Sequence, residues 1–518
     1  MHTERIAIID IGSNTIRLVI YGINEYFDVE ELHNIKTPAR LAECLEQDGN
    51  QFKLNAEGFQ RLQDALESFK VSIEQFEVDT LKALATAAIR QSSNSQEIID
   101  QMYEKTGIRI QLLSEADEAM YGQYAVIHTM NVFNGVTIDM GGASTEITLF
   151  EDNQMVEFHS FSFGTVNLKE KFFQDKAHND QDAINAVKQF LKNSFKSLSW
   201  LKKLKYPVVA MGGSARNIAN VYQRQIHYPM AGVHNYAMTV ETLEETLKLF
   251  QNTNYEDMDD IDGLSSDRVD IIIPATIAFI ELMKQVKAND LLISGQGIRE
   301  GIVLYHINHT YNMPIDNEQI RARTISQISR NLPVNTIGAY LRVNLCINLY
   351  QQICRLGILE YDYERHVELE FAAYLYRFGS FVSSESDSQH TFYLISSMNL
   401  FGFSHKKRLR LALLASYRNR SLFKQYIEDY KEWFTEEELD ELIALGGLLK
   451  FSVALNNSKT NPITHMKLVK DSSDNFTLKV YHDRPVLAEE YRTDRHKKHL
   501  ERTLKGSLDI QFIENKKE

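Results

Sequence analysis

A duplicated segment is the feature of this sequence that most constrains its fold. Residues 6–20 read IAIIDIGSNTIRLVI, and residues 135–149 read GVTIDMGGASTEITL. In each segment an apolar run ends in an aspartate, a glycine follows two residues later, and a second apolar run begins after small polar residues. Asp10 and Asp139 lie 139 − 10 = 129 residues apart. Two such strand–turn–strand segments predict a core made of two similar α/β halves.

The chemistry that suits these two turns is phosphate binding. Glycine lets backbone N–H groups approach an anion, and an aspartate at a strand end can hold a divalent cation beside it. A single D-x-G triplet is common by chance, whereas two in matching contexts are more specific; tight turns with solvated aspartates are the alternative. The candidate residues are Asp10, Gly12, Asn14, Asp139, Gly141, Gly142, Ser144 and Glu146. Of these, Asp139 and Glu146 are the candidates for organising Mg²⁺.

Two later segments repeat the order of strand, glycine turn and helix. Residues 211–219 read MGGSARNIA and present Gly212, Gly213 and Ser214 at a helix start, while residues 294–301 read SGQGIREG and contain Arg299. Ligands of open α/β sheets gather at the carboxyl ends of strands, and a helix N-terminus binds anions. These turns therefore predict further phosphate contacts, although the glycines could equally serve tight packing.

Glu118 and Arg90 are the candidates for direct chemistry between the two repeats. Glu118 lies in SEADEA, early in an expected helix that begins after the N-cap Ser114. On the residues alone, Glu118 reads as a surface acid favoured by the helix dipole. Arg90 ends the apolar segment LKALATAAIR, where its guanidinium could bind a phosphate bidentately or be solvated.

The remainder of the chain predicts additional domains. With 518 residues the chain is too long for one core, and residues 317–450 are rich in helix formers. From about residue 460, short alternating strands surround a basic helix. The expected domains are 1–125 and 126–307 as the two halves, 308–455 as a helical domain, and 456–518 as a small α+β tail.

Composition narrows the class of partner. The net charge of −14 argues against a nucleic-acid binder, so attraction to a polyanion needs local basic clusters such as residues 405–420 and 491–505. A solvated helix face is the alternative explanation of both clusters. No apolar run reaches transmembrane length, and the three cysteines have no CxxC spacing. We therefore expect a cytoplasmic protein without membrane insertion and with reduced thiols.

Together these segments resemble the exopolyphosphatase / guanosine pentaphosphate phosphohydrolase family of the actin-like and sugar-kinase-like superfamily. IDIGSNTIRLVI and IDMGGASTEI resemble its two phosphate loops, ATAAIRQ its T-x-x-x-R segment, and LSEADEAMYG its S-G-x-E-E-A helix. MGGSARNIA and LLISGQGIREGIVLY follow in the expected order. The resemblance implies a duplicated actin-like (ribonuclease H-like) α/β core with a cleft between its halves, an all-α HD-like domain and a small α+β tail.

The resemblance also assigns roles. It implies that Glu118 is the catalytic carboxylate, that Asp139, Glu146 and Asp10 organise the metal, and that Arg90 binds phosphate. The other expected phosphate-binding residues are Asn14, Gly141, Gly142, Ser144, Gly212, Gly213, Ser214 and Arg299. The expected cofactor is Mg²⁺, with another divalent or a monovalent cation as alternatives, and a homodimer is expected.

The sequence departs from the family pattern at several positions. Ala143 replaces the third glycine of the second loop, which requires a negative φ at that residue. The helical domain reads LYRFG where relatives often have L-H-D-I-G, so Tyr376 and Arg377 replace His and Asp. Asp387 and Ser388 stand where a histidine pair is expected. Without its ligands an HD metal site is not expected here.

The sequence therefore predicts an exopolyphosphatase that removes the terminal phosphate of inorganic polyphosphate. Hydrolysis of guanosine pentaphosphate needs the same loops and a base pocket, and is the nearest alternative. A catalytically weak protein that binds (p)ppGpp and a kinase of the same superfamily are further alternatives.

Overall fold

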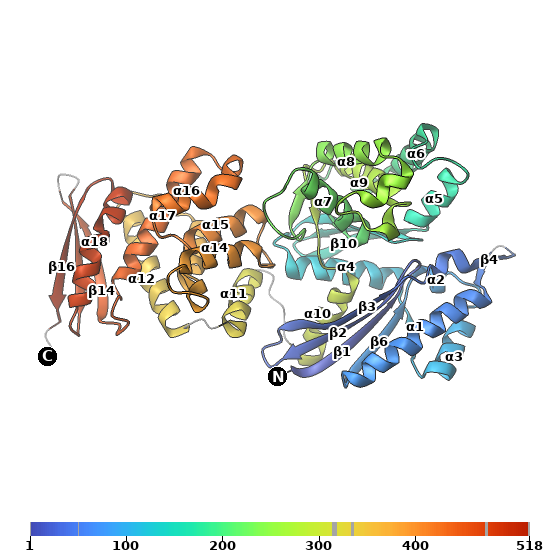
Figure 1. Ribbon diagram of the computed structural model, residues 1–518, viewed down its shortest axis with the longest axis horizontal. Coiled ribbons are helices and arrows are strands. Elements are labelled where there is room, and N and C mark those ends of the chain that lie inside the picture. Colours follow the sequence, from blue (N-terminus) through green and yellow to red (C-terminus); the bar gives the residue numbers. More distant parts are fainter. Residues whose placement is uncertain (1, 50, 313–318, 333–335, 472–474, 516–518) are drawn as a thin grey trace. The chain divides into compact units, whose positions relative to one another are not determined.

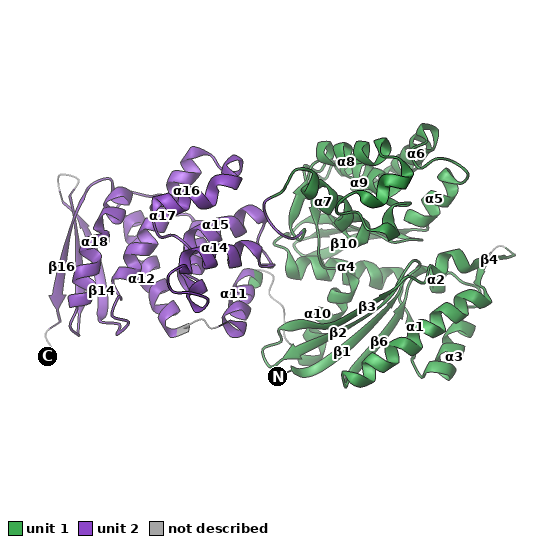
Figure 2. Cartoon of the chain, viewed as in Figure 1, with its two compact units in different colours: residues 1–228, 233–320 green, residues 229–232, 321–518 purple. Residues whose placement is uncertain are grey.

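The computed structural model describes residues 2–49, 51–312, 319–332, 336–471 and 475–515 (Figure 1). Within these residues the chain forms two compact units (Figure 2). Unit 1 consists of residues 1–228 and 233–320, and unit 2 consists of residues 229–232 and 321–518. The domain boundaries expected at residues 125 and 455 lie within these units and stay predictions.

Unit 1 contains two mixed sheets with the same arrangement of strands, which is the structural form of the duplication. The first has the order β3 (Val29–Thr37), β2 (Ile16–Asn24), β1 (His2–Ile11), β6 (Thr80–Ala85), β7 (Ile110–Leu112). The second has the order β10 (Gln154–Phe161), β9 (Thr145–Glu151), β8 (Gly135–Met140), β11 (Val208–Met211), β13 (Leu291–Ile293), β12 (Tyr236–Met238). In each, an antiparallel meander is followed by parallel strands, and the second sheet has one further strand, β12, which pairs antiparallel with β13.

The apolar runs of the repeats form central strands because both faces of each sheet are covered. In β1, the side chains of Ala7 and Ile9 pack with one hydrophobic cluster, and those of Ile6 and Ile8 pack with another. Alternate side chains of a strand point to opposite faces, so a strand buried on both faces reads as a continuous apolar run.

Ten helices surround these sheets in the described part of unit 1. They are α1 (Ala56–Gln75), α2 (Ala87–Arg90), α3 (Ser95–Thr106), α4 (Glu115–Thr129), α5 (Thr165–Phe173), α6 (Gln181–Ser197), α7 (Gly212–Gln225), α8 (Val240–Asn252), α9 (Ile272–Val286) and α10 (Ile298–Tyr311). A small hairpin of β4 (Leu45–Asp48) and β5 (Gln51–Leu54) completes the unit.

Each half of unit 1 contributes one helix that packs on the sheet of the other half. Helix α4 follows the first sheet in the chain, but its residues Val126 and Ile127 pack in one cluster with Phe150 of the second sheet. Conversely, α10 ends the second half, and its residues Ile302 and Ile307 belong to the cluster that covers the first sheet. The first turns of these helices carry Glu118 and Arg299, and the division expected at residue 125 falls inside α4.

Unit 2 consists of helices and one small sheet. The helices are α11 (Ile320–Asn331), α12 (Thr336–Arg355), α13 (Tyr363–Tyr374), α14 (Asp387–Ser397), α15 (His405–Ala415), α16 (Arg420–Ile427) and α17 (Glu436–Ala454). The sheet has the order β14 (Ile463–Lys470), β15 (Asn475–His482), β16 (Ser507–Glu514), and α18 (Leu487–Leu504) connects its last two strands. Helix α18 packs on α17 and so joins the sheet to the helices.

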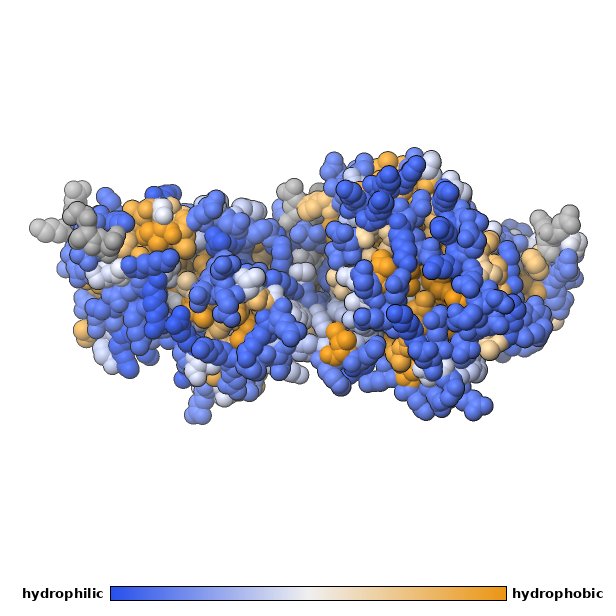
Figure 3. Space-filling view, turned by 90° about the horizontal axis from the view of Figure 1, so that it is seen from above, coloured by the Kyte–Doolittle hydropathy of each residue, from blue (hydrophilic) through white to orange (hydrophobic). Residues whose placement is uncertain are grey.

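The surface is mainly polar on the face seen in Figure 3, where hydrophobic residues gather only in small separate groups. Among the described residues, no helix is both long enough and apolar enough to cross a membrane.

Candidate active site

The two predicted phosphate loops have the same internal geometry. In the first, the Gly12 amide donates to the Thr15 carbonyl at 3.1 Å, and in the second the Gly141 amide donates to the Ser144 carbonyl at 3.0 Å. Backbone amides elsewhere in unit 1 donate to carbonyl groups within the two loops: Ala42 donates to the Ser13 carbonyl, and Val166 donates to the Gly142 carbonyl, both at 2.9 Å.

These hydrogen bonds leave several backbone amides of the two loops available for a ligand. In the part of the chain that the structure describes, the N–H groups of Ser13, Asn14, Gly142 and Ala143 donate no hydrogen bond. Adjacent unpaired N–H groups in tight turns form the concave nests that bind anions. Ala143 is absent from the residues with positive φ, so the alanine meets the condition that the sequence set for it.

The two loops approach each other closely from opposite halves of the core. A Cβ atom added to Gly142 would lie 3.3 Å from the Cβ of Ser13 and 3.9 Å from that of Asn14. Glycine at position 142 is therefore favoured by the close approach and not by an unusual φ. The two halves approach each other closely at this point, with an amide nest on each side.

Glu118 lies in the first turn of α4 and forms an ion pair with Arg90. Ser114 caps this helix as predicted, accepting a hydrogen bond from the Asp117 amide at 3.1 Å. Nη1 of Arg90 donates to Oε2 of Glu118 at 2.6 Å and to the Leu113 carbonyl at 2.8 Å. The Glu118 side chain is only 3% exposed. The helix thus presents a buried carboxylate whose orientation is set by an arginine.

Burial makes this carboxylate a strong base. Desolvation and, next, the charge of Glu146 raise the pKa of Glu118, while the Arg90 guanidinium offsets part of the rise. A carboxylate whose pKa is raised towards neutrality is suited to general acid–base catalysis near neutral pH.

Asp139 and Glu146 face each other across the second loop. They are directly opposite in the antiparallel pairing of β8 and β9, so their side chains share one face of the sheet. Burial raises the pKa of Asp139 to about 6, although Arg216, Arg299 and Arg268 lower it. Burial and the charge of Asp139 raise the pKa of Glu146, whose Oε1 accepts a hydrogen bond from Ser160 at 3.0 Å.

Gly212 shows why a glycine follows the strand beside Asp139. Its φ is +90°, and a Cβ atom there would lie 3.0 Å from Oδ1 of Asp139. Any other residue would be strained and would crowd the carboxylate. Ser214, two residues on, is buried, and its hydroxyl has no hydrogen-bond partner among the described residues. A buried hydroxyl without a partner at a helix start suits an anion as its acceptor.

The donor set fits a divalent cation held partly by substrate. Among the described residues, no three His, Cys, Asp or Glu side chains are grouped closely enough to hold a metal ion alone. Magnesium is bound in proteins by one or two carboxylates, with waters and substrate phosphate oxygens completing the shell. Asp139 and Glu146, whose pKa values burial raises, are such a pair.

Asp10, the third carboxylate expected at the metal, is engaged by an arginine. Its Oδ2 accepts from Nη1 of Arg299 at 3.0 Å, and Arg299 comes from the first turn of the exchanged helix α10. The phenol of Tyr21 donates to Glu300 at 2.8 Å beside this pair. Asp10 therefore holds Arg299 in place, and the Arg299 Nε group has no hydrogen-bond partner among the described residues.

Three arginines and one serine at this centre are not among the sequence candidates. The positive charge of Arg17 lowers the pKa of Asp10, and those of Arg216 and Arg268 lower the pKa of Asp139. The guanidinium of Arg268 lies against the backbone of Gly213, where an added Cβ would come within 2.8 Å of it. Arg17 and Arg216 lie inside the IDIGSNTIRLVI and MGGSARNIA segments, so their proximity to these turns was the available signal. Nothing local indicates Arg268 or Ser160.

Comparison with known proteins identifies the family of the chain. A family model for Ppx/GppA phosphatases matches residues 19–310, and a model for domain III of these phosphatases matches residues 320–496. The chain belongs to the Ppx/GppA phosphatase family. Members of this family hydrolyse phosphoanhydride bonds, and the chain is a hydrolase of that class.

Individual relatives are distant. A guanosine-5'-triphosphate,3'-diphosphate pyrophosphatase of Vibrio vulnificus (strain YJ016) is 24% identical over 498 residues, covering 92% of this chain and 91% of that protein. A Ppx/GppA protein of Aquifex aeolicus (TM-score 0.52, 23% identity) and an exopolyphosphatase of Cytophaga hutchinsonii (TM-score 0.53, 21% identity) each cover 60% of this chain and 99% of their own. They confirm the actin-like fold of the core.

Proposed function

We propose that this phosphatase is an exopolyphosphatase, which hydrolyses the terminal phosphoanhydride bond of inorganic polyphosphate. The observation that carries the proposal is the combination of a buried carboxylate of raised pKa, Glu118, with two amide nests that face each other where the halves approach closely. Phosphoryl transfer needs mainly positioning and stabilisation of charge on the transferred group. The amides of Ser13, Asn14, Gly142 and Ala143 supply both without contacting any part of a substrate beyond its phosphates.

The proposed reaction uses one water molecule for each phosphate released. Glu118 accepts a proton as the water oxygen bonds to the terminal phosphorus and the bridging P–O bond breaks. Orthophosphate leaves, and the chain that remains keeps a terminal phosphate. Arg90 fixes the Glu118 carboxylate, and Arg299, held by Asp10, neutralises charge on the phosphates. A magnesium ion on Asp139 and Glu146 would supply further charge stabilisation for the transferred group.

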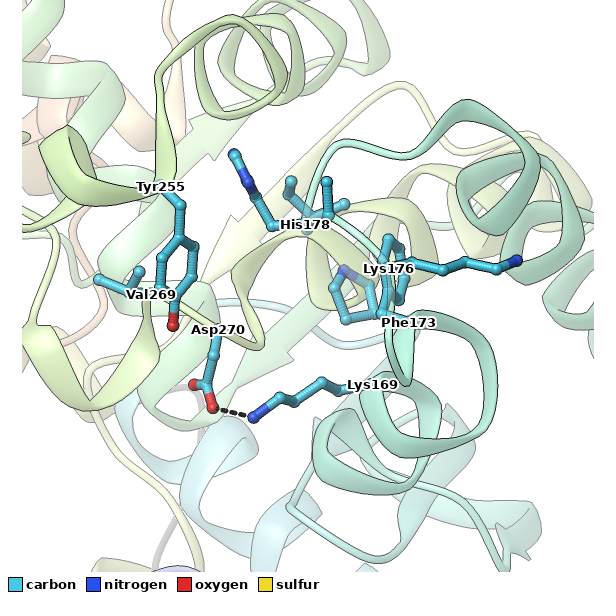
Figure 4. A pocket seen from close by; sticks show the side chains of 10 residues that line it. Lys169, Phe173, Lys176, His178, Tyr255, Val269 and Asp270 are labelled. Carbon is cyan, nitrogen blue, oxygen red and sulfur yellow. Dashed lines mark hydrogen bonds and ion pairs between the residues drawn. The ribbon is translucent and has the colours of Figure 1, made fainter.

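A specific observation favours hydrolysis of guanosine pentaphosphate as a second candidate. Unit 1 contains a cavity of about 370 Å³, lined by Lys169, Phe173, Lys176, Ala177, His178, Tyr255, Val269, Asp270, Ile273 and Pro274 (Figure 4). This size is within the range of small-ligand sites. Asp270 lies two residues from Arg268, so their Cα atoms are at most roughly 7 Å apart. The cavity is therefore near the cleft.

The cavity lining matches a guanine base in chemistry. Nζ of Lys169 and Oδ2 of Asp270 form an ion pair of 2.6 Å, drawn in Figure 4 below the ring of Tyr255. Guanine presents an acceptor, O6, beside the N1–H and N2–H donors, which an ammonium and a carboxylate complement. The tyrosine ring offers a surface on which a base can stack.

The experiment that tests the proposal compares phosphate release from long polyphosphate and from guanosine pentaphosphate by the same preparation. The proposal expects a higher kcat/KM on polyphosphate and an unchanged KM for polyphosphate in Tyr255→Ala. A higher kcat/KM on guanosine pentaphosphate, together with a KM for it that rises in Tyr255→Ala, would establish the second candidate instead. No phosphate release from either substrate would contradict both.

A further inference from the structure

An ion pair between Lys36 and Asp267 joins the two halves of unit 1. Nζ of Lys36 lies 2.7 Å from Oδ2 of Asp267, although the two residues are 231 positions apart. Lys36 belongs to β3 of the first sheet, whereas Asp267 lies in a short 3₁₀ helix, η4 (Ser266–Arg268), of the second half. The side chains are partly buried, with exposed fractions of 36% and 24%. The pair therefore fixes η4 against the first sheet.

The lysine of this pair belongs to the row of residues that contains Asp10. In the first sheet Asp10 lies directly opposite Arg17, and Arg17 lies directly opposite Lys36. Residues that are opposite each other on neighbouring strands project from the same face of a sheet. Because neighbouring strands are about 4.8 Å apart, the backbone of Lys36 is roughly 10 Å from that of Asp10. The ion pair is thus anchored on the face of the sheet where Asp10 holds Arg299.

The aspartate of this pair also contacts Arg268, an arginine of the acidic centre. The oxygen that binds Lys36, Oδ2, is 3.5 Å from Nε of Arg268. Burial acts to raise the pKa of Asp267, but the hydrogen bond from Lys36 and the charge of Arg268 outweigh it and lower the pKa. The carboxylate is therefore ionised near neutral pH, and one of its oxygens holds a cation of each half.

Hydrogen bonds fix the backbone of η4 on helix α7. The Ser265 amide donates to Oδ1 of Asn217 at 2.6 Å, and the Arg268 amide donates to the Ser265 carbonyl at 2.9 Å. Nδ2 of the same Asn217 donates to the carbonyl of Gly213, against which the Arg268 guanidinium lies. Among the described residues, Asp267 is the only carboxylate within ion-pair distance of Arg268. The backbone is thus held by α7, while the direction of the arginine side chain depends on Asp267.

We propose that Asp267 is a positioning residue for the hydrolysis and that Lys36 is its anchor on the first half. Lys36 holds the Asp267 carboxylate, and the carboxylate holds the Arg268 guanidinium over the turn at Gly213, where its charge acts on Asp139. Neither Lys36 nor Asp267 needs to contact the substrate. The proposal rests on the phosphoanhydride hydrolysis of the family and is the same for polyphosphate and for guanosine pentaphosphate.

The test compares kcat/KM for phosphate release by the full chain and its variants, on polyphosphate and on guanosine pentaphosphate. Asp267→Asn keeps the shape of the side chain and removes its charge, so kcat/KM should fall about tenfold, the scale of one charge-assisted contact. Lys36→Gln should lower kcat/KM about threefold, because this pair is partly exposed. Lys36→Arg restores the charge and should return kcat/KM to within about twofold of the parent value.

Lys284→Gln is the matched control. Lys284 forms an ion pair of 2.6 Å with Glu244, and the exposed fractions of 40% and 44% are similar, but both residues belong to the second half. This variant should keep kcat/KM within about twofold. Thermal unfolding of each variant checks that it is folded. If Asp267→Asn does not fold, the loss in Lys36→Gln and its recovery in Lys36→Arg decide the question.

The double variant Lys36→Gln/Asp267→Asn shows whether the two residues act as a unit. If Lys36 acts through Asp267, the double variant should lose no more activity than Asp267→Asn alone, because residues in one network are not additive. Unchanged kcat/KM in folded Asp267→Asn, losses that multiply in the double variant, no recovery in Lys36→Arg, or an equal loss in Lys284→Gln would overturn the proposal. A parent protein that hydrolyses only guanosine pentaphosphate would contradict the proposed function, and the same comparison on that substrate would still decide this proposal.

Discussion

Replacing Glu118 by glutamine isolates the role of the base from that of its position. Glutamine keeps the size of the side chain, and its amide oxygen can still accept the hydrogen bond that Arg90 donates at 2.6 Å. The proton acceptor is lost, and removal of a general base costs roughly 10²–10⁴ in turnover. Because each factor of ten is about 1.4 kcal/mol, the barrier should rise by about 3–5.5 kcal/mol. KM should change little, since the amide nests are unaltered.

Glu115→Gln is the matched control for this variant. Glu115 lies in the same helical turn, and its carboxylate is 3.7 Å from the same guanidinium, but its side chain is 49% exposed. An exposed ion pair contributes little, so the control should keep its rate within about twofold. The assay is the initial rate of phosphate release from polyphosphate, with folding checked by thermal unfolding.

The pH dependence provides a second readout of the same variant. The pKa of Glu118 is raised, chiefly by burial, so the parent rate should rise with pH until this carboxyl is ionised. In Glu118→Gln the part of the rise that this carboxyl contributes should disappear, while the part contributed by Asp139 and Glu146 remains. A folded Glu118→Gln protein with near-normal turnover, or one whose rate keeps the parent's pH dependence, would refute the assignment of Glu118 as the base.

Further predictions concern the metal, the acidic centre, the loops and unit 2. Asp139→Asn should abolish activation by Mg²⁺ in a metal titration of the rate, and a parent rate that is unchanged in excess chelator would contradict metal assistance. Burial raises the pKa values of Asp139 and Glu146, so between about pH 4 and about pH 7 the folded state keeps protons that the unfolded state has released. The free energy of unfolding without metal should therefore fall as pH rises through this range. A free energy of unfolding, measured with denaturant in the absence of metal, that is highest at neutral pH would contradict this. Gly142→Val should reduce kcat/KM on the order of 10²-fold, because its Cβ would lie 3.3 Å from Ser13 and push the loops apart; unchanged kcat/KM in a folded Gly142→Val protein would contradict this role of the loops. Elemental analysis of the full chain should find no bound transition metal in the helical domain, because Asp387 is paired with Arg377. A metal that is present in the parent protein and lost in Asp387→Ala would contradict this.

Local patterns predicted much of the core. The apolar runs around Asp10 and Asp139 gave the antiparallel strand pairs, and Ser114 marked a helix start that the structure contains. These features depend on neighbouring residues and on the period of two along a strand, so a single sequence carries them. The repetition of the strand order in both sheets follows from the same duplication.

Features that depend on distant residues were not predictable in this way. The exchange of α4 and α10 is decided by which sheet each apolar helix face covers, and Ile302 and Val126 look alike in the sequence. The engagement of Asp10 by Arg299 joins residues 289 positions apart. The basic cluster at 405–420 could not be distinguished from that at 491–505, because only the fold supplies Glu438, Glu364 and Glu368 as partners to Lys406, Lys407 and Arg410.

Several sequence predictions stay predictions. The roles of the named site residues, the use of Mg²⁺, the homodimer and the cytoplasmic location each need an experiment on the protein. The ion pair between Glu118 and Arg90 supports the role of Glu118 as a base. It also occupies one N–H group of the Arg90 guanidinium, which leaves fewer donors for a phosphate. The Nη2 group of Arg90, which is buried without a hydrogen-bond partner among the described residues, is the part that could still contact a substrate.

The central claim is that the cleft removes phosphates one at a time from the end of a polyphosphate chain. Its most direct test follows the products of long polyphosphate over time in the presence of Mg²⁺, by gel electrophoresis of the chains and a phosphate assay. The account predicts orthophosphate as the released product, with the remaining chains shortening and no fragments of intermediate length arising from internal cuts. Internal fragments, or intact chains in a preparation that releases phosphate from guanosine pentaphosphate, would contradict it.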